Sequence, residues 1–515
     1  VRADLLARIG QGGRAQGDEY VSIENLAGSA FADQLFGTGG VNTLSGADGD
    51  DQLEGLGGAD RLEGGAGDDR LDGGLGPDAL IGGDGRDTAD YSDSAAAVTV
   101  NLAAGTGAGG EAAGDTLSEV EDVIGSNFAA TLPGDGEDNG LQGGRGADRL
   151  IGGRGDDTLE GGRGADDLRG NGGSDWASYR LSLDGVTVDL ANADAGGGDA
   201  DGDVFTSIEN IEGSFHDDVL RGDAGANTIR GGEGADEING RGGLDWADYS
   251  DSASGVTVDL GAGTGAGGSA EGDRLSNIEA LIGSAYDDDL TGAAGAQTLD
   301  GGFGEDALAG GAGGDVYLLK LDGARDRIEE NGAAGDADVV RVGPGIGPDD
   351  IAVVRLEGGG LLLEVARDDG FLIDSMTVAD HFAGPETGVE RVEFEDGTAW
   401  DRAEIETRAR DDVFQAMDDV VRFADEDVVV EFAPSLQTRN DTPSRDESIQ
   451  VISVDAVSGG TVELDGGVVR FLSEANFNGD AFFDYTATDG VSEITARAEV
   501  VVRPINDAPE ATDDG

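Results

Sequence analysis

The sequence predicts an all-β protein in which residues 1–318 form a stacked coil of short strands and the remaining residues form smaller β domains. Three observations predict this fold. A nine-residue repeat runs through residues 28–318, and inserts of equal length interrupt it without breaking its frame. Short β-branched or aliphatic runs, separated by glycine and aspartate turns, follow the repeat.

The repeat has the consensus Gly-Gly-x-Gly-x-Asp-x-Leu-x, and residues 64–72 and 152–160 are its clearest copies. Position eight is mostly Leu or Ile, falls on a short strand, and is expected to point into the coil. The copies form four blocks of seven, six, four and four units, at residues 28–90, 125–178, 213–248 and 283–318.

Three β inserts of identical length separate the blocks, at residues 91–124, 179–212 and 249–282. Each closes on an Ile/Val-Glu pair that contains Glu121, Glu209 or Glu279. The spacing from the first glutamate to the second exceeds that from the second to the third by two whole units. This preserved frame favours a stacked coil, because a partial unit would move every later side chain out of register. Residues 1–27 align with the end of an insert, so we expect the chain to begin inside a repeat module.

The composition limits the class of partner. Asp and Glu number 108 against 32 Lys and Arg, which gives a formal net charge of −76. Nucleic acids and anionic membranes bind basic surfaces, so neither is expected as a partner of this chain. Cations are the expected partners. The chain has no cysteine for disulfides and no apolar stretch near the roughly 18 residues of a membrane helix. Metal ions are therefore the expected means of stabilisation.

Position six of the repeat carries an aspartate beside glycines at positions one, two and four. Glycine turns expose backbone carbonyls, because glycine tolerates positive φ and a close approach of neighbouring chains. Calcium takes about six to eight oxygen ligands, so one turn supplies about half a shell and a stacked neighbour supplies the rest. The pattern predicts Ca²⁺ ions that bridge turns, on the order of ten in all.

These repeats and inserts resemble the RTX (repeats-in-toxin) family of haemolysin-type calcium-binding proteins. The resemblance implies a parallel β-roll in which two nonapeptides make one turn. It implies carboxylate ligands at Asp33, Asp51, Asp60, Asp69, Asp78, Asp87, Asp148, Asp157, Asp166, Asp175, Asp218, Asp236, Asp245, Asp288, Asp306 and Asp315. It also implies backbone carbonyl ligands at Gly65, Gly67, Gly74, Gly76, Gly83 and Gly85.

Some units lack the aspartate of position six. These units carry Asn42, Ala130, Asn139, Asn227 and Gln297 in its place. All of them are the first or second unit of a block. We therefore expect the block entrances to bind calcium weakly or not at all.

The C-terminal third contains two further resemblances. Residues 313–405, with Gly345–Ile351 and Glu393–Trp400, resemble the haemolysin-type calcium-binding related domain, and we place this β domain at residues 319–410. Residues 411–509 resemble a bacterial cadherin-like β-sandwich, and residues 510–515 resemble the start of a further linker or domain. By position in that family, Asp489, Asn506 and Asp507 are tentative calcium ligands at the end of the sandwich.

The leading functional hypothesis is a calcium-binding structural segment of a large secreted RTX adhesin or surface-layer-like protein. The resemblance implies export by type I secretion and folding outside the cell. We expect no catalysis, because His216 and His381 lie far apart and no zinc-protease or nucleophile-elbow motif is present. Two alternatives stay open: the non-catalytic tail of a secreted protease, lipase or epimerase, and a module that binds a cell-surface glycan through aromatic side chains.

Overall fold

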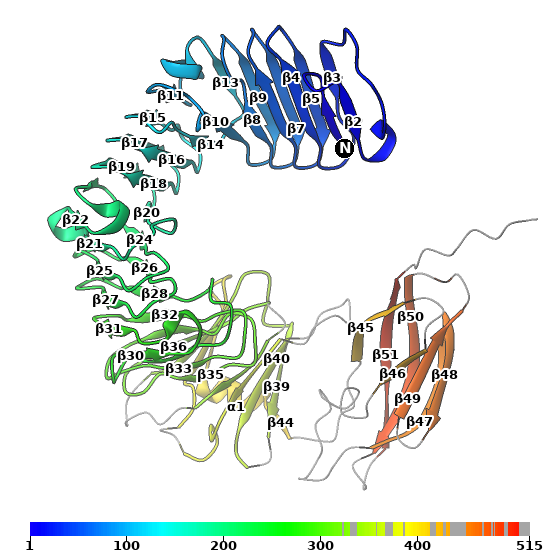
Figure 1. Ribbon diagram of the computed structural model, residues 1–515. Helices are drawn as coiled ribbons and strands as arrows, with labels where there is room; N and C mark the ends of the chain where they lie inside the picture. The colour runs from blue at the N-terminus through cyan, green and yellow to red at the C-terminus, as the bar shows by residue number, and fades with distance from the viewer. Residues whose placement is uncertain are drawn as a thin grey trace, which may run out of the picture. The chain divides into compact units, whose positions relative to one another are not determined.

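The computed structural model confirms the all-β fold class and the parallel roll (Figure 1). It divides into two compact units, Val1–Ala293 and Ala294–Gly515. The boundary falls inside the fourth block of repeats. The structure describes residues 1–321, 324–329, 337–356, 358–365, 374–384, 387–411, 419–425, 429–432, 450–465, 468–474, 477, 479–488 and 493–503.

The first unit is a roll with two faces of mainly parallel strands, because consecutive nonapeptides place their strands alternately on the two faces; the strands of the second face fall in two separate sheets. Strands on one face pair in parallel at a register of two whole repeat units, so that Leu35 faces Leu53. The first face contains β4 (Gln34–Thr38), β6 (Gln52–Leu56), β8 (Arg70–Asp72), β10 (Thr88–Asp90), β14 (Asp122–Ile124), β16 (Gly140–Arg145), β18 (Thr158–Arg163), β20 (Trp176–Ser178), β24 (Asn210–Glu212), β26 (Thr228–Arg230), β28 (Trp246–Asp248) and β32 (Ala280–Ile282).

The second face repeats the same parallel pairing, and Leu44 faces Leu62 there. Its repeat strands are β3 (Asn25–Ala27), β5 (Thr43–Asp48), β7 (Arg61–Ala66), β9 (Ala79–Asp84), β15 (Thr131–Pro133), β17 (Arg149–Arg154), β19 (Asp167–Gly172), β25 (Val219–Arg221), β27 (Glu237–Asn239) and β33 (Asp289–Thr291). The prediction that position eight points inward is confirmed, since Leu53, Leu62 and Leu71 have no exposed surface.

Each insert adds strands to the second face, while its last strand (β14, β24 or β32) continues the first face. In the first insert, β13 pairs in parallel with β9, β12 runs antiparallel between β13 and β11, and β11 pairs in parallel with β15. The insert elements are β11 (Thr99–Asn101), β12 (Thr106–Ala108), η2 (Gly110–Ala112), β13 (Thr116–Ser118), β21 (Thr187–Asp189), η3 (Leu190–Asn192), β22 (Asp194–Gly196), η4 (Gly198–Ala200), β23 (Val204–Thr206), β29 (Thr257–Asp259), β30 (Thr264–Ala266), η5 (Gly268–Ala270) and β31 (Arg274–Ser276).

The N-terminal residues fold like the end of an insert. β1 (Arg2–Asp4) pairs in parallel with β4 and antiparallel with β2 (Ile9–Gln11), and η1 (Gly13–Ala15) follows. In the first insert, β11 likewise pairs in parallel with a repeat strand, β15, and antiparallel with the next insert strand, β12. The alignment of residues 1–27 with an insert therefore has a structural counterpart.

The second unit continues with parallel strands and then changes to antiparallel pairing. β36 pairs in parallel with β38, whereas β39 and β40 form an antiparallel hairpin. Its elements up to residue 411 are β34 (Thr298–Asp300), β35 (Ala307–Ala309), β36 (Val316–Leu319), β37 (Arg325–Ile328), β38 (Val339–Val342), β39 (Ile351–Arg355), β40 (Leu361–Val365), β41 (Ser375–Val378), β42 (Arg391–Glu393), β43 (Ala399–Asp401), α1 (Arg402–Arg408) and β44 (Arg410–Asp411). The Asp401 carboxylate caps α1 by accepting from the Glu404 N–H.

The last region has two sheets, in the strand orders β45-β51-β50-β47 and β46-β49-β48. Phe471 of one sheet stacks on Phe483 of the other, with ring centroids 6.3 Å apart, in a core of buried aliphatic and aromatic side chains. The strands are β45 (Asp419–Asp425), β46 (Val429–Phe432), β47 (Gln450–Ser458), β48 (Gly460–Asp465), β49 (Val468–Ser473), β50 (Gly479–Thr488) and β51 (Glu493–Arg503).

Candidate metal sites

The aspartates of position six lie buried in two columns, one at each edge of the roll. In the first column, the Asp51 N–H donates to Asp69 Oδ1 at 2.8 Å, and the Asp69 N–H donates to Asp87 Oδ1 at 2.9 Å. In the second column, the Asp60 N–H donates to Asp78 Oδ1 at 2.7 Å. Each carboxylate therefore uses one oxygen to join two successive coils. The parallel register of two repeat units creates these columns.

The second carboxylate oxygen, Oδ2, is buried without a hydrogen-bond partner through most of the described segment 1–293. It is so in Asp51, Asp60, Asp69, Asp78, Asp87, Asp148, Asp157, Asp166, Asp175, Asp236 and Asp245. A buried unsatisfied polar oxygen costs on the order of 1–3 kcal/mol, and a charged one costs more. Such an oxygen recurring in one phase of a repeat indicates a cation that binds between the coils.

A backbone carbonyl of the next coil lies close to this oxygen at several of these aspartates. A Cβ atom built on Gly46 would lie 2.0 Å from Asp51 Oδ2 and 2.6 Å from the carbonyl oxygen of Gly64. At Gly143, a Cβ would lie 2.6 Å from Asp148 Oδ2 and 2.6 Å from the carbonyl oxygen of the corresponding glycine one coil on. The glycine of position one thus leaves open a space that oxygens of two coils share. Hard cations such as calcium prefer this combination of carboxylate and carbonyl oxygens.

The sequence analysis assigned carbonyl ligands to glycine positions two and four, and the geometry adds position one as a candidate. Gly65, Gly67, Gly74, Gly76, Gly83 and Gly85 all have positive φ and stack on the coil before them. A Cβ on Gly76 would lie 1.6 Å from the carbonyl oxygen of Gly58. Gly46 and Gly64 have no positive φ, so their backbone conformation does not require glycine. Glycine nevertheless recurs at position one. This recurrence is the sequence signal that could have located the space shared by the two coils.

The aspartates of the first unit in three blocks differ from the others. The N–H of Ser29 donates to Asp33 Oδ2 at 2.5 Å, and the N–H of Ser214 donates to Asp218 Oδ2 at 2.6 Å. The Asp288 carboxylate accepts in the same way from a serine N–H at 2.6 Å. In these units the protein itself satisfies the oxygen that is unpartnered in later units.

The asparagines of position six have protein partners for both the oxygen and the nitrogen of the side-chain amide. Asn139 Oδ1 accepts from the Asp135 N–H at 2.8 Å, and its Nδ2 donates to the Glu121 carbonyl at 2.9 Å. Asn42 and Asn227 make the same pair of contacts, with Glu24 and Glu209 as their carbonyl partners. At these three positions an asparagine therefore joins the block entrance to the backbone of a glutamate that precedes it, whereas Ala130 and Gln297 have no such explanation.

The inserts continue both columns with carboxylates that the sequence analysis did not assign. On the first face, Glu121 Oε2 accepts from the Asp87 N–H at 2.8 Å, and Glu209 and Glu279 do the same for the next blocks. On the second face, Asp115 Oδ1 accepts from the Asp78 N–H, and its Oδ2 accepts from the Tyr91 hydroxyl at 3.1 Å. Asp203 and Asp273 pair with Tyr179 and Tyr249 in the same way. The constant spacing between the Tyr and the Asp in all three inserts was a visible signal of this pairing.

Position five forms a separate, exposed row. The Asp68 N–H donates to Asp50 Oδ1 at 3.0 Å, and the Asp156 N–H donates to Asp138 Oδ1 at 2.7 Å. These bonds run toward the preceding coil, opposite in direction to those of position six. The neighbouring aspartates Asp156 and Asp157 thus have different environments, which makes them a matched pair for substitution.

The remaining predicted ligands lie in the second unit or outside the described residues. Asp306 and Asp315 are buried, and their N–H groups donate to Asp326 Oδ1 and Asp338 Oδ1 at 3.2 and 2.9 Å. The tentative junction ligands Asp489, Asn506 and Asp507 lie outside the described residues. No group of three or more His, Cys, Asp or Glu side chains gathers as a metal cluster in the part of the chain that the structure describes. Backbone carbonyls would therefore have to supply much of each calcium shell.

Burial changes the acidity of the aspartates in both columns. It raises the pKa of Asp69 and Asp78 to about 7 and that of Asp236 to about 8, and the neighbouring carboxylates add to the rise. In the absence of metal, these carboxyl groups therefore hold protons near neutral pH. A proton would satisfy the same buried oxygen that the expected calcium ion would bind.

We expect acid to restore part of the roll when calcium is absent. The folded-state pKa values exceed the unfolded value of about 4, so the folded state binds more protons and its stability falls as pH rises through about 6 to 8. In excess chelator, lowering pH from about 8 to about 5 should increase the far-UV circular dichroism signal of β structure. In roughly millimolar calcium this gain should vanish, because the sites are already filled. No gain in chelator would contradict this reading of the buried carboxyls.

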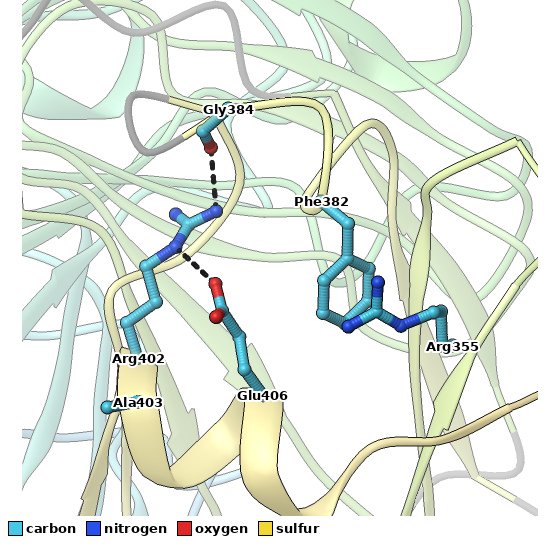
Figure 2. A pocket seen from close by; sticks show the side chains of 6 residues that line it. All are labelled: Arg355, Phe382, Gly384, Arg402, Ala403 and Glu406. Carbon is cyan, nitrogen blue, oxygen red and sulfur yellow. Dashed lines mark hydrogen bonds and ion pairs between the residues drawn. The ribbon is translucent and has the colours of Figure 1, made fainter.

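A pocket of about 520 Å³ lies in the second unit beside α1, and Figure 2 shows its lining. Arg402 uses all five of its N–H donors on the protein. Its Nε donates to Glu406 at 3.1 Å, and its other nitrogens donate to Glu390 and to the carbonyls of His381, Gly384 and Thr387. Arg355 lies over the Phe382 ring at 3.7 Å. Arg402 therefore joins the loop to the helix, and none of its donors is left for a ligand.

Comparison with known families agrees with this geometry. The model of the RTX calcium-binding nonapeptide repeat matches residues 27–62, 54–89, 142–177, 212–247 and 282–317. The haemolysin-type calcium binding protein related domain matches residues 353–404, and the cadherin-like domain matches residues 411–503. The chain thus contains RTX repeats, the related domain and a cadherin-like domain, in that order. No curated protein matches the chain. Among the described residues, no helix is long and apolar enough to cross a membrane.

Proposed function

We propose that this chain is a calcium-folded structural segment of a large secreted adhesin or surface-layer-like protein. Residues 1–318 form the calcium-dependent roll, residues 319–410 form a β domain, and residues 411–509 form the cadherin-like sandwich. The observation that carries the proposal is the series of buried, unpartnered Oδ2 atoms at position six, several of them beside a backbone carbonyl of the next coil.

Calcium binding explains why so acidic a chain can be compact. The net charge of −76 opposes folding, and each bridging ion removes local repulsion in the folded state alone. The chain would stay unfolded where calcium is scarce, pass through a type I secretion system, and fold in roughly millimolar extracellular calcium. The matched families are structural calcium-binding and cadherin-like types, which supports a structural role over a catalytic one.

The ion content and its location test this proposal. Native mass spectrometry of the whole chain should find on the order of ten calcium ions. Asp157→Asn should remove one or two ions and leave the chain folded, because Asn139 shows that the turn accommodates an asparagine. Asp156→Asn is the matched control, because the Asp156 carboxylate accepts from the Ser174 N–H in the exposed row, and it should remove none. A wild-type content of two or three ions, or equal losses in both variants, would refute the position-six sites.

A further inference from the structure

An acidic pocket lies where the third insert covers the third block. Its volume is about 580 Å³, and it is lined by the loop Asp251–Ser254, by Gly268, Ser269 and Glu271 around η5, and by Phe215, Glu233 and Gly234 of two repeat turns. All of these residues belong to the first unit and lie in the described segment 1–321. Three carboxylates line this pocket, and one of them, Asp251, lies 3.9 Å from Nε of Arg230, which is not part of the lining.

Two side chains of the pocket have an unusual environment. The Ser269 residue is 6% exposed, and its hydroxyl oxygen is buried without a hydrogen-bond partner. The Phe215 ring is 51% exposed, although it occupies a repeat turn where most side chains are small or polar. A buried hydroxyl, an open aromatic face and three carboxylates together favour a cationic group with a flat surface.

The second insert shows what fills the same place elsewhere in this chain. When the second and third inserts are aligned on Glu209 and Glu279, Arg163 takes the place of Glu233 and Asp199 that of Ser269. Both loops have the same serine bonds, since the N–H groups of Asp199 and Ser269 donate to a loop serine at 3.1 and 3.0 Å. In the second insert the guanidinium of Arg163 lies 3.6 Å from Asp199.

A second arginine of the chain also faces Asp199. Burial raises the pKa of the Asp199 carboxyl, whereas the positive charges of Arg163 and Arg145 oppose that rise. Arg145 corresponds to Phe215 in the third insert. The third insert therefore has a phenylalanine and a glutamate at the positions of two arginines, and it has no counterpart of the ion pair between Arg163 and Asp199.

We propose that the pocket of the third insert receives an arginine side chain from a basic partner polypeptide. The planar guanidinium would stack on Phe215 and donate to the carboxylates of Glu233 and Glu271. A lysine would reach the carboxylates but lacks the planar face. A bare metal ion would not use the aromatic ring, and the described carboxylates do not gather as a metal cluster. The strongly negative chain would attract such a basic partner from a distance.

The test uses the whole chain in calcium and physiological salt, with Nα-acetyl-arginine amide as the probe. Saturation-transfer NMR titrations should give a dissociation constant about threefold lower than that of Nα-acetyl-lysine amide, and Phe215→Ala should raise it about threefold. Glu233→Arg should abolish binding, because it supplies the guanidinium from the chain itself. Asp84→Arg, the same charge change at position three of a unit in the first block, is the matched control and should leave binding intact.

Three outcomes would overturn the inference. Equal binding of the lysine and arginine probes would exclude a guanidinium site. If glucosamine binds more tightly than the arginine probe, and Glu233→Arg abolishes that binding, the pocket would be assigned to an amino sugar. Unchanged binding in Glu233→Arg would place the probe elsewhere. Because the pocket exists only in the folded roll, circular dichroism of each sample in calcium separates a failure of this inference from a failure of calcium-dependent folding.

Discussion

Deletion of residues 64–81 is expected to leave a folded roll that is one coil shorter, whereas deletion of residues 64–68 is expected to abolish folding of the first block. The longer deletion removes two whole units, one from each face. Strands on one face pair at a register of two units, so β6 would then meet β10 as it now meets β8. The Asp51 N–H would find the Asp87 carboxylate, and the Asp60 N–H would find Asp115.

The shorter deletion breaks the same contacts although it removes fewer atoms. Five is an odd number, so the strand residues after the deletion point to the opposite side and Leu71 leaves the interior. Loss of one buried leucine costs on the order of 2–3 kcal/mol, and the following aspartates also lose phase with their neighbours. Thermal unfolding in calcium, followed by circular dichroism, should show a cooperative transition for the two-unit deletion and a much weaker one for the shorter deletion. Equal transitions in both variants would contradict a stacked coil.

The phase of the repeat was predictable because it depends on local pattern. The inward position of Leu53 and the burial of Asp69 both follow from a nine-residue unit with one hydrophobic position and one carboxylate. The weak block entrances were also predicted, and the serine and asparagine contacts supply a physical basis for that prediction. The residues of each turn, repeated in one frame, were therefore sufficient to predict which side chains are buried and which units depart from the pattern.

The contacts that join an insert to a block were not predictable from spacing within one unit. Glu121 reaches the Asp87 N–H across the whole insert, and Tyr91 reaches Asp115 within the insert only after its strands have folded back. The sequence analysis identified the Ile/Val-Glu pairs as markers of the frame, but it did not recognise the glutamate as a continuation of the aspartate column. The sequence analysis did not single out glycine position one, because it did not separate the glycines with positive φ from those that only allow a close approach of neighbouring coils.

Removal of calcium at neutral pH is expected to unfold the roll and to leave the cadherin-like sandwich folded. The roll holds many buried carboxylates whose only counter-charge would be the bound ion, whereas the sandwich has an apolar core around Phe471 and Phe483. An ion that binds only the folded state stabilises it by about 2.7 kcal/mol at a hundredfold excess over its dissociation constant, and several sites add together. Loss of all ions would therefore exceed the roughly 5–15 kcal/mol that typically separates folded from unfolded domains.

Hydrogen–deuterium exchange of the whole chain, resolved by peptide, tests calcium-driven folding most directly. In roughly millimolar calcium, peptides from residues 28–293 should be protected, and in excess chelator they should exchange at the rate of an unfolded chain. Magnesium should not restore protection, because it demands tight octahedral geometry and retains its water ligands. Peptides from β49 to β51 should stay protected in all three conditions and serve as the internal control. Full protection of residues 28–293 in chelator would contradict the account.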